Sequence, residues 1–254
     1  MINNIPLSLE KRISVSGAFW EKRIKTNTAD SQILNNSNLD YILETILYGR
    51  KIQKDEFDSF LDPKVNQLLN DPNNLIDMDV AVERIVTSMI EKKKIGIIGD
   101  YDVDGTTSAS LLTNFFSYYS IDTDVYIPNR LKDGYGPNIE AFNQFIDKGI
   151  DTVITVDCGS TAIQPLEYAF NKDINVIIID HHKVDHNLPQ CFAHINPTRD
   201  DDKSELNHLA AVGLTFLFIV ALRRKLREIK QFNHINEPNL KKYLDIVALG
   251  TICD

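Results

Sequence analysis

The sequence predicts an α/β fold in which a parallel sheet carries helices on both faces, preceded by a small helical N-terminal region. Three observations favour this class. Short continuous apolar runs recur after residue 94, as in strands that are buried on both faces. Stretches of about a dozen residues with helical periodicity separate these runs. Three of the runs end in aspartate, and ligands of such sheets bind beyond the carboxyl ends of the strands.

The polar, Asn-rich beginning of the chain is expected to form helices in pieces. Apolar residues return at spacings of three and four over Leu39–Tyr48 and Phe57–Leu69. Asp62-Pro63 interrupts the second stretch, because the residue before a proline disfavours the helical conformation. A turn-forming cluster, Asp71–Asn74, then marks a boundary. We therefore expect two domains, residues 1–75 and residues 76–254.

The second domain is expected to begin with an amphipathic helix over Asp77–Lys92, with Asp77 as its N-cap. Four strands are predicted after it, at Ile95–Ile98, Asp124–Ile127, Thr152–Val156 and Val176–Ile179. Three helices lie between them, at Thr106–Tyr119, Asn138–Lys148 and Thr161–Lys172. Two further apolar helices are predicted at Leu209–Lys230 and Leu240–Leu249.

The net charge of −9 lies almost entirely in the predicted second domain. Residues 95–254 carry 14 Lys and Arg against 22 Asp and Glu. This balance argues against a simple basic nucleic-acid-binding module, because phosphate backbones are bound through Lys and Arg. It leaves open an enzyme whose positive charge comes from metal ions.

The cysteines, the chain ends and the apolar runs indicate the cellular compartment of the protein. Cys158, Cys191 and Cys253 form no CxxC pair, so neither a disulfide framework nor a zinc knuckle is expected. No apolar run approaches the roughly 18 residues that span a bilayer, and the start lacks a secretory signal pattern. We expect a cytoplasmic protein. The sequence stops on an apolar helix followed by Asp254, and we expect it to be a fragment of a longer chain.

The segment that follows the first predicted strand is the main candidate for chemistry. Asp100, Asp102 and Asp104 alternate there and run into a helix. As a strand they would share one face, and as a strand-to-helix turn they would line an oxygen-rich cup. Either arrangement needs a divalent ion, and oxygen ligands favour Mg²⁺ or Mn²⁺. An EF-hand loop is the weaker alternative, since its twelfth position needs Glu and is Leu111 here.

Two further strand ends carry residues of the same kind. Asp157 follows the third predicted strand, and Asp180, His181 and His182 follow the fourth. A single strand-end aspartate is more often a helix cap than a ligand, but carboxylates and histidines at successive strand ends point to one metal site. Mixed His and Asp ligation favours Mn²⁺ over Mg²⁺.

These segments together resemble the ordered motifs of the DHH phosphoesterase superfamily. The motifs are DYDVDG at Asp100–Gly105, VDCGS around Asp157, DHH at Asp180–His182 and LAAVG at Leu209–Gly213. Further stretches resemble the bacterial single-strand-specific exonucleases within it: Leu61–Pro63, Ala81–Arg84, Asp133–Gly136 and Asn196–Arg199. The resemblance covers nearly the whole chain.

The resemblance implies specific roles by matching positions. Two ions, Mn²⁺ or Mg²⁺, would be held by Asp102, Asp104, Asp157, His181 and Asp254, with Asp157 between them. The catalytic residues would be Asp100, Asp180 and His182, with His182 beside the scissile phosphate and Asp180 orienting a neighbour. The substrate would meet Arg130, which matches a terminal-phosphate position. By residue chemistry rather than by the resemblance, Arg199 is a cation that could guide a strand, and Tyr135 could stack on a base, although a glycine-flanked loop is equally often only a turn. One position departs from the pattern, since many superfamily members have a histidine where this chain has Ile98.

The resemblance also implies a metal-dependent 5'-to-3' exonuclease that acts on single-stranded DNA in recombination and repair. Its expected partners are single-stranded DNA, recombination or single-strand-binding proteins, and further C-terminal domains of the same chain, with no membrane. Two alternatives stay open. One is a small-nucleotide phosphodiesterase or pyrophosphatase on the same scaffold, and the other is a non-catalytic scaffold relative.

Overall fold

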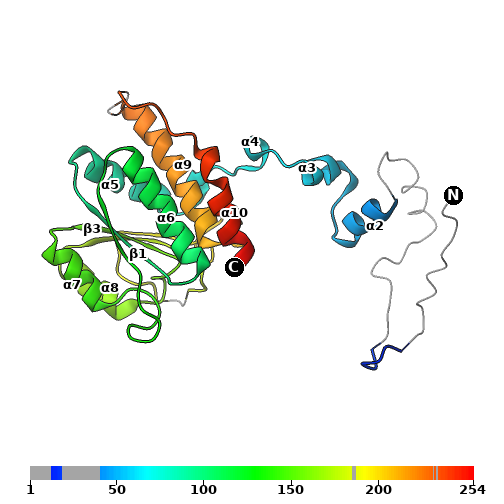
Figure 1. Cartoon of the computed structure of the whole chain (residues 1–254), viewed down its shortest axis with the longest axis horizontal. Coiled ribbons are helices and arrows are strands. Elements are labelled where there is room, and N and C mark those ends of the chain that lie inside the picture. Colours follow the sequence, from blue (N-terminus) through cyan, green and yellow to red (C-terminus); the bar gives the residue numbers. More distant parts are fainter. Residues whose placement is uncertain (1–12, 19–40, 185–186, 231, 233) are drawn as a thin grey trace. The chain divides into compact units, whose positions relative to one another are not determined.

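The computed structural model describes residues 13–18, 41–184, 187–230, 232 and 234–254. By its internal contacts the chain divides into two compact units, residues 1–69 and residues 70–254. Each unit has its own helices, which Figure 1 colours along the sequence. The metal-site candidates all belong to the second unit.

The first unit contains short helices. They are α2 (Tyr41–Gly49), the 3₁₀ turn η1 (Lys54–Glu56), α3 (Phe57–Leu61) and α4 (Val65–Leu68). The predicted break at Asp62-Pro63 separates α3 from α4. Residues 39 and 40 of the first predicted helix lie outside the described residues. Tyr48 and Phe57 pack edge to face, with ring centroids 5.2 Å apart, and so connect α2 to α3.

The second unit is a five-stranded, fully parallel sheet in the order β2-β1-β3-β4-β5. The strands are β1 (Ile95–Gly99), β2 (Thr123–Tyr126), β3 (Thr152–Val156), β4 (Asn175–Ile179) and β5 (Ala193–Ile195). The helices are η2 (Pro72–Asn74), α5 (Met78–Ile90), α6 (Val103–Tyr118), α7 (Ile139–Asp147), α8 (Ile163–Phe170), α9 (Ala211–Ile229), η3 (Leu240–Tyr243) and α10 (Leu244–Cys253). The predicted α/β class with a parallel sheet is confirmed.

Both faces of the sheet are covered, as the continuous apolar strands require. Ile97 of β1 and Ile154 of β3 belong to the core shared with α5, α6 and α9. Ile98 and Val153, which are their immediate neighbours along the two strands, belong to the core shared with α7 and α8. Figure 1 shows α7 and α8 on the side opposite α5, α6 and α9. Neighbouring residues of a strand therefore serve different layers.

Two features of the second unit differ from the sequence-based expectation. Strand β5 was not predicted, because Ala193–Ile195 is only three residues long and lies after a polar stretch. Asp77 stands at the N-cap position of α5 but makes no capping hydrogen bond. Its Oδ2 accepts instead from the backbone N of His194 (3.0 Å) and from Arg199 (2.8 Å). A tertiary contact with β5 thus takes the place of the local cap.

The longest helix, α9, has 19 residues and changes character along its length. Its first turns are buried, and its last turns carry Arg223, Arg224, Lys225 and Arg227. Within the described ranges, no helix combines the length and apolarity that a bilayer span would need.

Candidate metal centre

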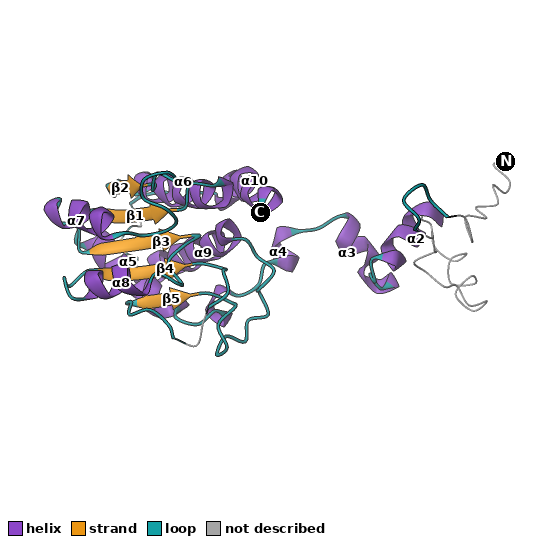
Figure 2. Cartoon of the chain, turned by 90° about the horizontal axis from the view of Figure 1, so that it is seen from below, coloured by secondary structure: helices purple, strands orange, loops and turns teal. Residues whose placement is uncertain are grey.

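The carboxyl ends of β1, β3 and β4 bring three aspartates to one edge of the sheet. These strands lie side by side (Figure 2). The ladder continues one residue past each strand, because the backbone N of Asp100 donates to Val156 O (3.3 Å) and that of Asp157 to Ile179 O (3.0 Å). The backbone N of Asp180 donates to Ile195 O (3.1 Å). All three side chains are almost completely buried.

The triple-aspartate segment is a strand-to-helix turn, which decides between the two arrangements left open by the sequence. Asp102 is the N-cap of α6, and its Oδ1 accepts from the backbone N of Gly105 at 3.0 Å. A Cβ on Gly105 would lie 2.5 Å from backbone atoms of Asp100, so only glycine permits this tight approach. Because α6 begins at Val103, the segment does not have the extended loop of an EF-hand.

Asp104 connects this turn to two distant helices. Its Oδ2 accepts from the backbone N of Ala211 (2.6 Å) and its Oδ1 from that of Val212 (2.8 Å), at the N-terminus of α9. The carboxylate therefore satisfies two N–H groups that a helix start leaves without intrahelical partners. Asp104 Oδ2 also lies 3.7 Å from His181 Nε2, and Asp254 Oδ1 lies 3.8 Å from the same nitrogen. The end of α10 thus reaches the same place.

Seven side chains form three overlapping groups in which the potential ligand atoms lie within 4.8 Å of one another. The groups are Asp100, Asp102 and Asp157; Asp104, His181 and Asp254; and Asp157, His181 and His182. Asp157 occurs in two groups and lies 3.3 Å from His181 Nε2 through its Oδ1. The structure therefore brings together all five predicted metal ligands, and it adds Asp100 and His182 to the same cluster.

Several atoms of this cluster are buried without a hydrogen-bond partner among the described residues. They are Asp100 Oδ1, both carboxylate oxygens of Asp157, and His181 Nε2. A buried polar atom without a partner costs about 1–3 kcal/mol. Asp157 also has φ of 60°, a left-handed conformation that costs a residue with a Cβ about 1–2 kcal/mol. Lone pairs and an imidazole nitrogen directed at one another in this way fit divalent cations of the Mn²⁺ and Mg²⁺ type.

The electrostatics of the cluster are those of crowded, desolvated carboxylates. Burial, together with the negative charges of Asp104 and Asp102, raises the pKa of Asp157 to about 7. Burial also raises the pKa of Asp104 and of Asp100. Each carboxylate makes its neighbour harder to ionise, and a bound cation would remove that penalty.

The aspartate of the DHH motif has the opposite environment. Asp180 Oδ1 accepts from His182 Nδ1 and from the backbone N of His181, both at 2.8 Å. Although burial opposes it, the bond and positive charge of His182 and the bonds from Ser160 lower the pKa of Asp180 to about 2. Asp180 in turn raises the pKa of His182 to about 9. Asp180 is therefore a fixed anion that orients the His182 ring.

Of the three predicted substrate contacts, Tyr135 lies in the cluster. Its hydroxyl donates to the backbone O of Asp157 (2.9 Å) and lies 3.1 Å from His182 Nδ1. The residue as a whole is 45% exposed. Arg130 is exposed and lies over the Tyr101 ring, 5.3 Å from its centroid, close enough to act on the charge of Asp100.

The contacts of Arg199 lie outside the cluster. Its guanidinium pairs with Asp77 (2.8 Å) and Asp201 (2.7 Å) and donates to the backbone O of His194 (2.6 Å). Its side chain is 9% exposed. The guanidinium is therefore used to hold β5, and the geometry gives no support to the expected contact with substrate.

The residues that sequence reasoning missed lie around Asp180. Ser160 donates its backbone N–H to Asp180 Oδ2 at 3.0 Å, and Asn196 binds Ser160 Oγ at 2.9 Å. Ser160 belongs to the segment VDCGS and Asn196 to the segment NPTR. Both segments are among the motifs that carry the resemblance, but serine and asparagine are not typical metal ligands, so the sequence assigned these two side chains no role.

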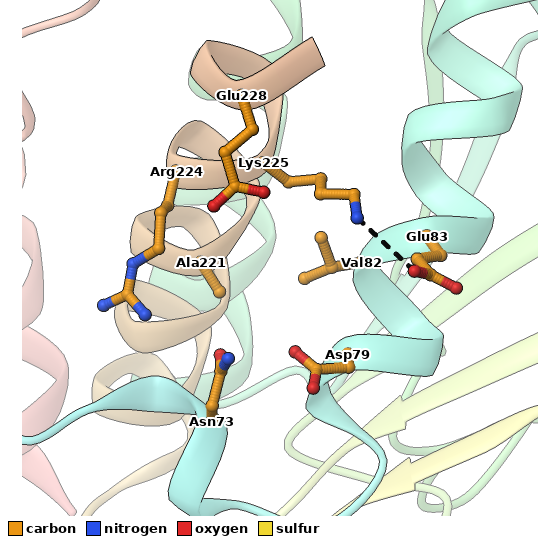
Figure 3. A pocket seen from close by; sticks show the side chains of 8 residues that line it. All are labelled: Asn73, Asp79, Val82, Glu83, Ala221, Arg224, Lys225 and Glu228. Carbon is orange, nitrogen blue, oxygen red and sulfur yellow. Dashed lines mark hydrogen bonds and ion pairs between the residues drawn. The ribbon is translucent and has the colours of Figure 1, made fainter.

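A polar pocket of about 270 Å³ lies at the far end of α9 from this cluster. Figure 3 shows α5 and α9 lining it, with Lys225 directed at Glu83, 3.4 Å away. Arg224 pairs with Asp71 (2.9 Å), and Arg227 with Glu237 (2.6 Å). These cations at the end of α9 are paired with carboxylates of the chain.

Comparison with known proteins gives consistent matches. Residues 94–251 match the DHH family, N-terminal domain. The chain is 35% identical over 84% of its length to the single-stranded-DNA-specific exonuclease RecJ of Haemophilus influenzae, of which it covers 36%. A crystal structure of exonuclease RecJ bound to manganese matches 70% of this chain and 43% of its own, with 29% identity and a TM-score of 0.60. RecJ of Thermus thermophilus in complex with Mn²⁺ matches 81% of this chain and 27% of its own, with 25% identity and a TM-score of 0.61. The chain thus spans about a third of the length of such curated relatives.

Proposed function

The chain belongs to the DHH family, and on that premise we propose that it is the metal-binding catalytic part of an exonuclease specific for single-stranded DNA. The proposed reaction is hydrolysis of the terminal phosphodiester bond, from the 5' end, in DNA recombination and repair. The curated relative named single-stranded-DNA-specific exonuclease RecJ supports the substrate class, and the manganese-bound exonuclease RecJ supports the dependence on metal. The proposed place of action is the cytoplasm.

The observation that carries the proposal is the shared position of Asp157. Its two oxygens have no hydrogen-bond partner among the described residues, and it groups with Asp100 and Asp102 on one side and with His181 on the other. A carboxylate between two ligand sets is the arrangement that a pair of ions requires. We therefore propose Asp104, His181 and Asp254 as ligands of one ion and Asp102, with Asp100, as ligands of the other.

Asp100 was expected to be a catalytic residue, and its surroundings favour a role as a metal ligand. Ile98, at the position where many superfamily members have histidine, is fully buried against α7 and α8. Asp100 instead supplies an unpartnered oxygen to the group with Asp102 and Asp157. We propose that this carboxylate is a metal ligand in addition to, or in place of, the catalytic role expected from the sequence.

Bound divalent ions would supply a water of lowered pKa and would neutralise the phosphate oxygens. The chain's own residues do the rest. Asp180 holds the His182 ring by its Nδ1, and Nε2, which has no hydrogen-bond partner among the described residues, would meet a phosphate oxygen or the leaving oxygen. Arg130, exposed beside Asp100, is placed to bind a terminal phosphate. The positive charge that binds the phosphates of the substrate would thus come from the ions and from Arg130.

A nuclease assay with purified chain and Mn²⁺ tests the proposal. Single-stranded DNA labelled at the 5' end should release labelled mononucleotide first, whereas 3'-labelled strand and duplex should not. Asp102→Ala should lose the activity and Tyr168→Phe, on α8, should keep it. Faster turnover of dinucleotides than of long strands would favour the small-nucleotide phosphodiesterase instead. Absence of cleavage by both this chain and a version extended with the remaining domains would refute the proposal.

A further inference from the structure

The His182 ring is held on a segment that has no regular secondary structure. Residues 180–184 follow β4 as a loop, and the His182 side chain is 46% exposed. Asp180 fixes the ring from one side, through the 2.8 Å bond to Nδ1. The Tyr135 hydroxyl also lies 3.1 Å from Nδ1, but neither of these contacts ties the backbone of the loop to a neighbouring strand, and loops carry few packing contacts of their own. A second anchor is therefore needed on the backbone of this loop.

Asn196 provides that anchor from the end of β5. Its side chain is fully buried, and its Nδ2 donates to the backbone O of His182 at 2.9 Å. The hydroxyl of Thr198 lies 2.8 Å from the same carbonyl oxygen. Asn196 Oδ1 accepts from the backbone N of Thr198 at 2.8 Å, which fixes the orientation of the amide group.

The same amide also reaches the other side of the Asp180–His182 pair. The second hydrogen of Asn196 Nδ2 goes to Ser160 Oγ at 2.9 Å. Ser160, in the loop after β3, donates its backbone N–H to Asp180 Oδ2 at 3.0 Å, and its hydroxyl lies 2.8 Å from His194 Nε2 of β5. One buried amide thus ties together the loops after β3 and β4. Both donors of Asn196 are used, one by the backbone O of His182 and one by Ser160 Oγ, and neither goes to a side-chain ligand atom of the cluster.

We propose that Asn196, assisted by Thr198, is a positioning residue that holds the His182 backbone so that its imidazole stays directed at the phosphate. The inference rests on the proposed function. It assigns a role to Asn196 and Thr198 that the ligand chemistry of the cluster does not require. Networks behind a site that fix the orientation of its groups are worth about 10- to 100-fold in activity.

Four variants test this role. Asn196→Asp has the same shape but replaces the two N–H donors with an acceptor. Thr198→Val removes the hydroxyl at constant shape, whereas Thr198→Ser keeps the hydroxyl. Tyr168→Phe is the matched control, since it removes one side-chain hydrogen bond between α8 and Asn143 of α7 that touches neither loop. Melting temperatures establish that each variant is folded.

Two measurements are made on the complete chain. With saturating Mn²⁺ and single-stranded DNA, Asn196→Asp should lower kcat by about 10- to 100-fold while KM stays within about twofold. Thr198→Val should lower kcat by a smaller factor, and Thr198→Ser should keep a kcat close to that of the unmodified chain. In the metal-free chain, exchange of the His181 and His182 backbone amides should be about tenfold faster in Asn196→Asp and unchanged in Tyr168→Phe.

The outcomes separate this inference from the function on which it rests. If the unmodified chain and its extended version cleave nothing, the exonuclease proposal fails, and amide exchange still tests whether Asn196 holds the loop. Unchanged exchange at His181 and His182 in Asn196→Asp overturns the positioning role. The role is also overturned if Thr198→Ser, which keeps the hydroxyl, loses as much kcat as Thr198→Val. It is overturned as well if Asn196→Asp raises KM as much as it lowers kcat and the Tyr168→Phe control behaves in the same way.

Discussion

Strand β3 carries an aspartate beyond each end, and the two lie in opposite surroundings. At the amino end, Asp151 accepts from Arg84 (3.0 Å) and Lys93 (2.8 Å). At the carboxyl end, Asp157 forms its ion pairs within the described residues with His181 and His182 only. Despite partial burial, the bonds from Lys93 and Thr152 lower the pKa of Asp151. Burial raises the pKa of Asp157 to about 7.

The difference shows how one residue type serves stability at one edge of a sheet and chemistry at the other. The amino-end edge has its counter-charges built into the chain, so Asp151 contributes to folding. At the carboxyl-end edge Asp157 has no Lys or Arg partner among the described residues and meets only His181 and His182, so burial of its charge destabilises the metal-free fold and a bound cation would relieve this. Sites arranged for a ligand commonly store free energy in this way.

Asp157→Asn should give the largest effect and the clearest contrast. The amide loses the charge that lies between the two ligand sets, so Mn²⁺-dependent cleavage should fall by about a thousandfold or more. Asparagine tolerates the left-handed backbone found there. Because a buried carboxylate whose burial outweighs its contacts with the two histidines is removed, the metal-free chain should become more stable, on the order of 1–3 kcal/mol at pH 8. Mn²⁺-dependent cleavage and denaturant unfolding measure the two changes. A variant less stable than the unmodified chain would contradict this account of Asp157.

The pH dependence of stability sharpens the same comparison. The folded chain keeps a proton on Asp157 up to about pH 7, whereas the unfolded chain releases it near pH 4. Between these values the folded state binds more protons, so this group makes the metal-free chain less stable as pH rises from about 4 to 7. The stabilisation by Mn²⁺ should grow over the same window, since ligands bind metal in their deprotonated form. Melting curves with and without Mn²⁺ at pH 5 and pH 8 measure this. An Mn²⁺ shift that is equal at both pH values would argue against Asp157 as a ligand.

Asp151→Asn should give the smallest effect and the opposite sign. Its partners are partly exposed, with 16% of the Arg84 side chain and 44% of the Lys93 side chain accessible. The loss of unfolding free energy should therefore be about 0.5–1 kcal/mol at neutral pH. The lowered pKa of Asp151 means that its contribution is present above about pH 4 and is lost in acid. The melting-temperature shift caused by Mn²⁺ should be unchanged. A change in that shift would place Asp151 in the metal centre and remove the contrast.

Local patterns were sufficient for much of the architecture. The apolar runs at Ile95, Thr152 and Val176 became β1, β3 and β4 within a residue of the predicted bounds. The helix-breaking effect of Asp62-Pro63 appears as the gap between α3 and α4. These features depend on residues within one or two turns of each other, and periodicity reports such relations directly.

Relations between distant segments were harder to predict from one sequence. Asp77 fits the pattern of an N-cap, yet it binds His194 and Arg199, more than 115 positions along the chain. Arg199 fits the pattern of a DNA contact, yet its charge is used inside the protein. A local pattern indicates which interactions a side chain is able to make. The partners that folding brings near it determine which of these interactions forms.

The sequence by itself determined the parallel α/β class, the aspartates at the strand ends and the residue types suited to divalent ions, because these depend on neighbours along the chain. Only the tertiary structure decided that Asp254 at the end of α10 meets Asp104 and His181, that Asp100 joins the Asp157 group, and that Asn196 supports the His182 loop. These meetings follow from the strand order and from the docking of α9 and α10 on α6. Packing across the whole core sets that geometry, and no short window of sequence contains it.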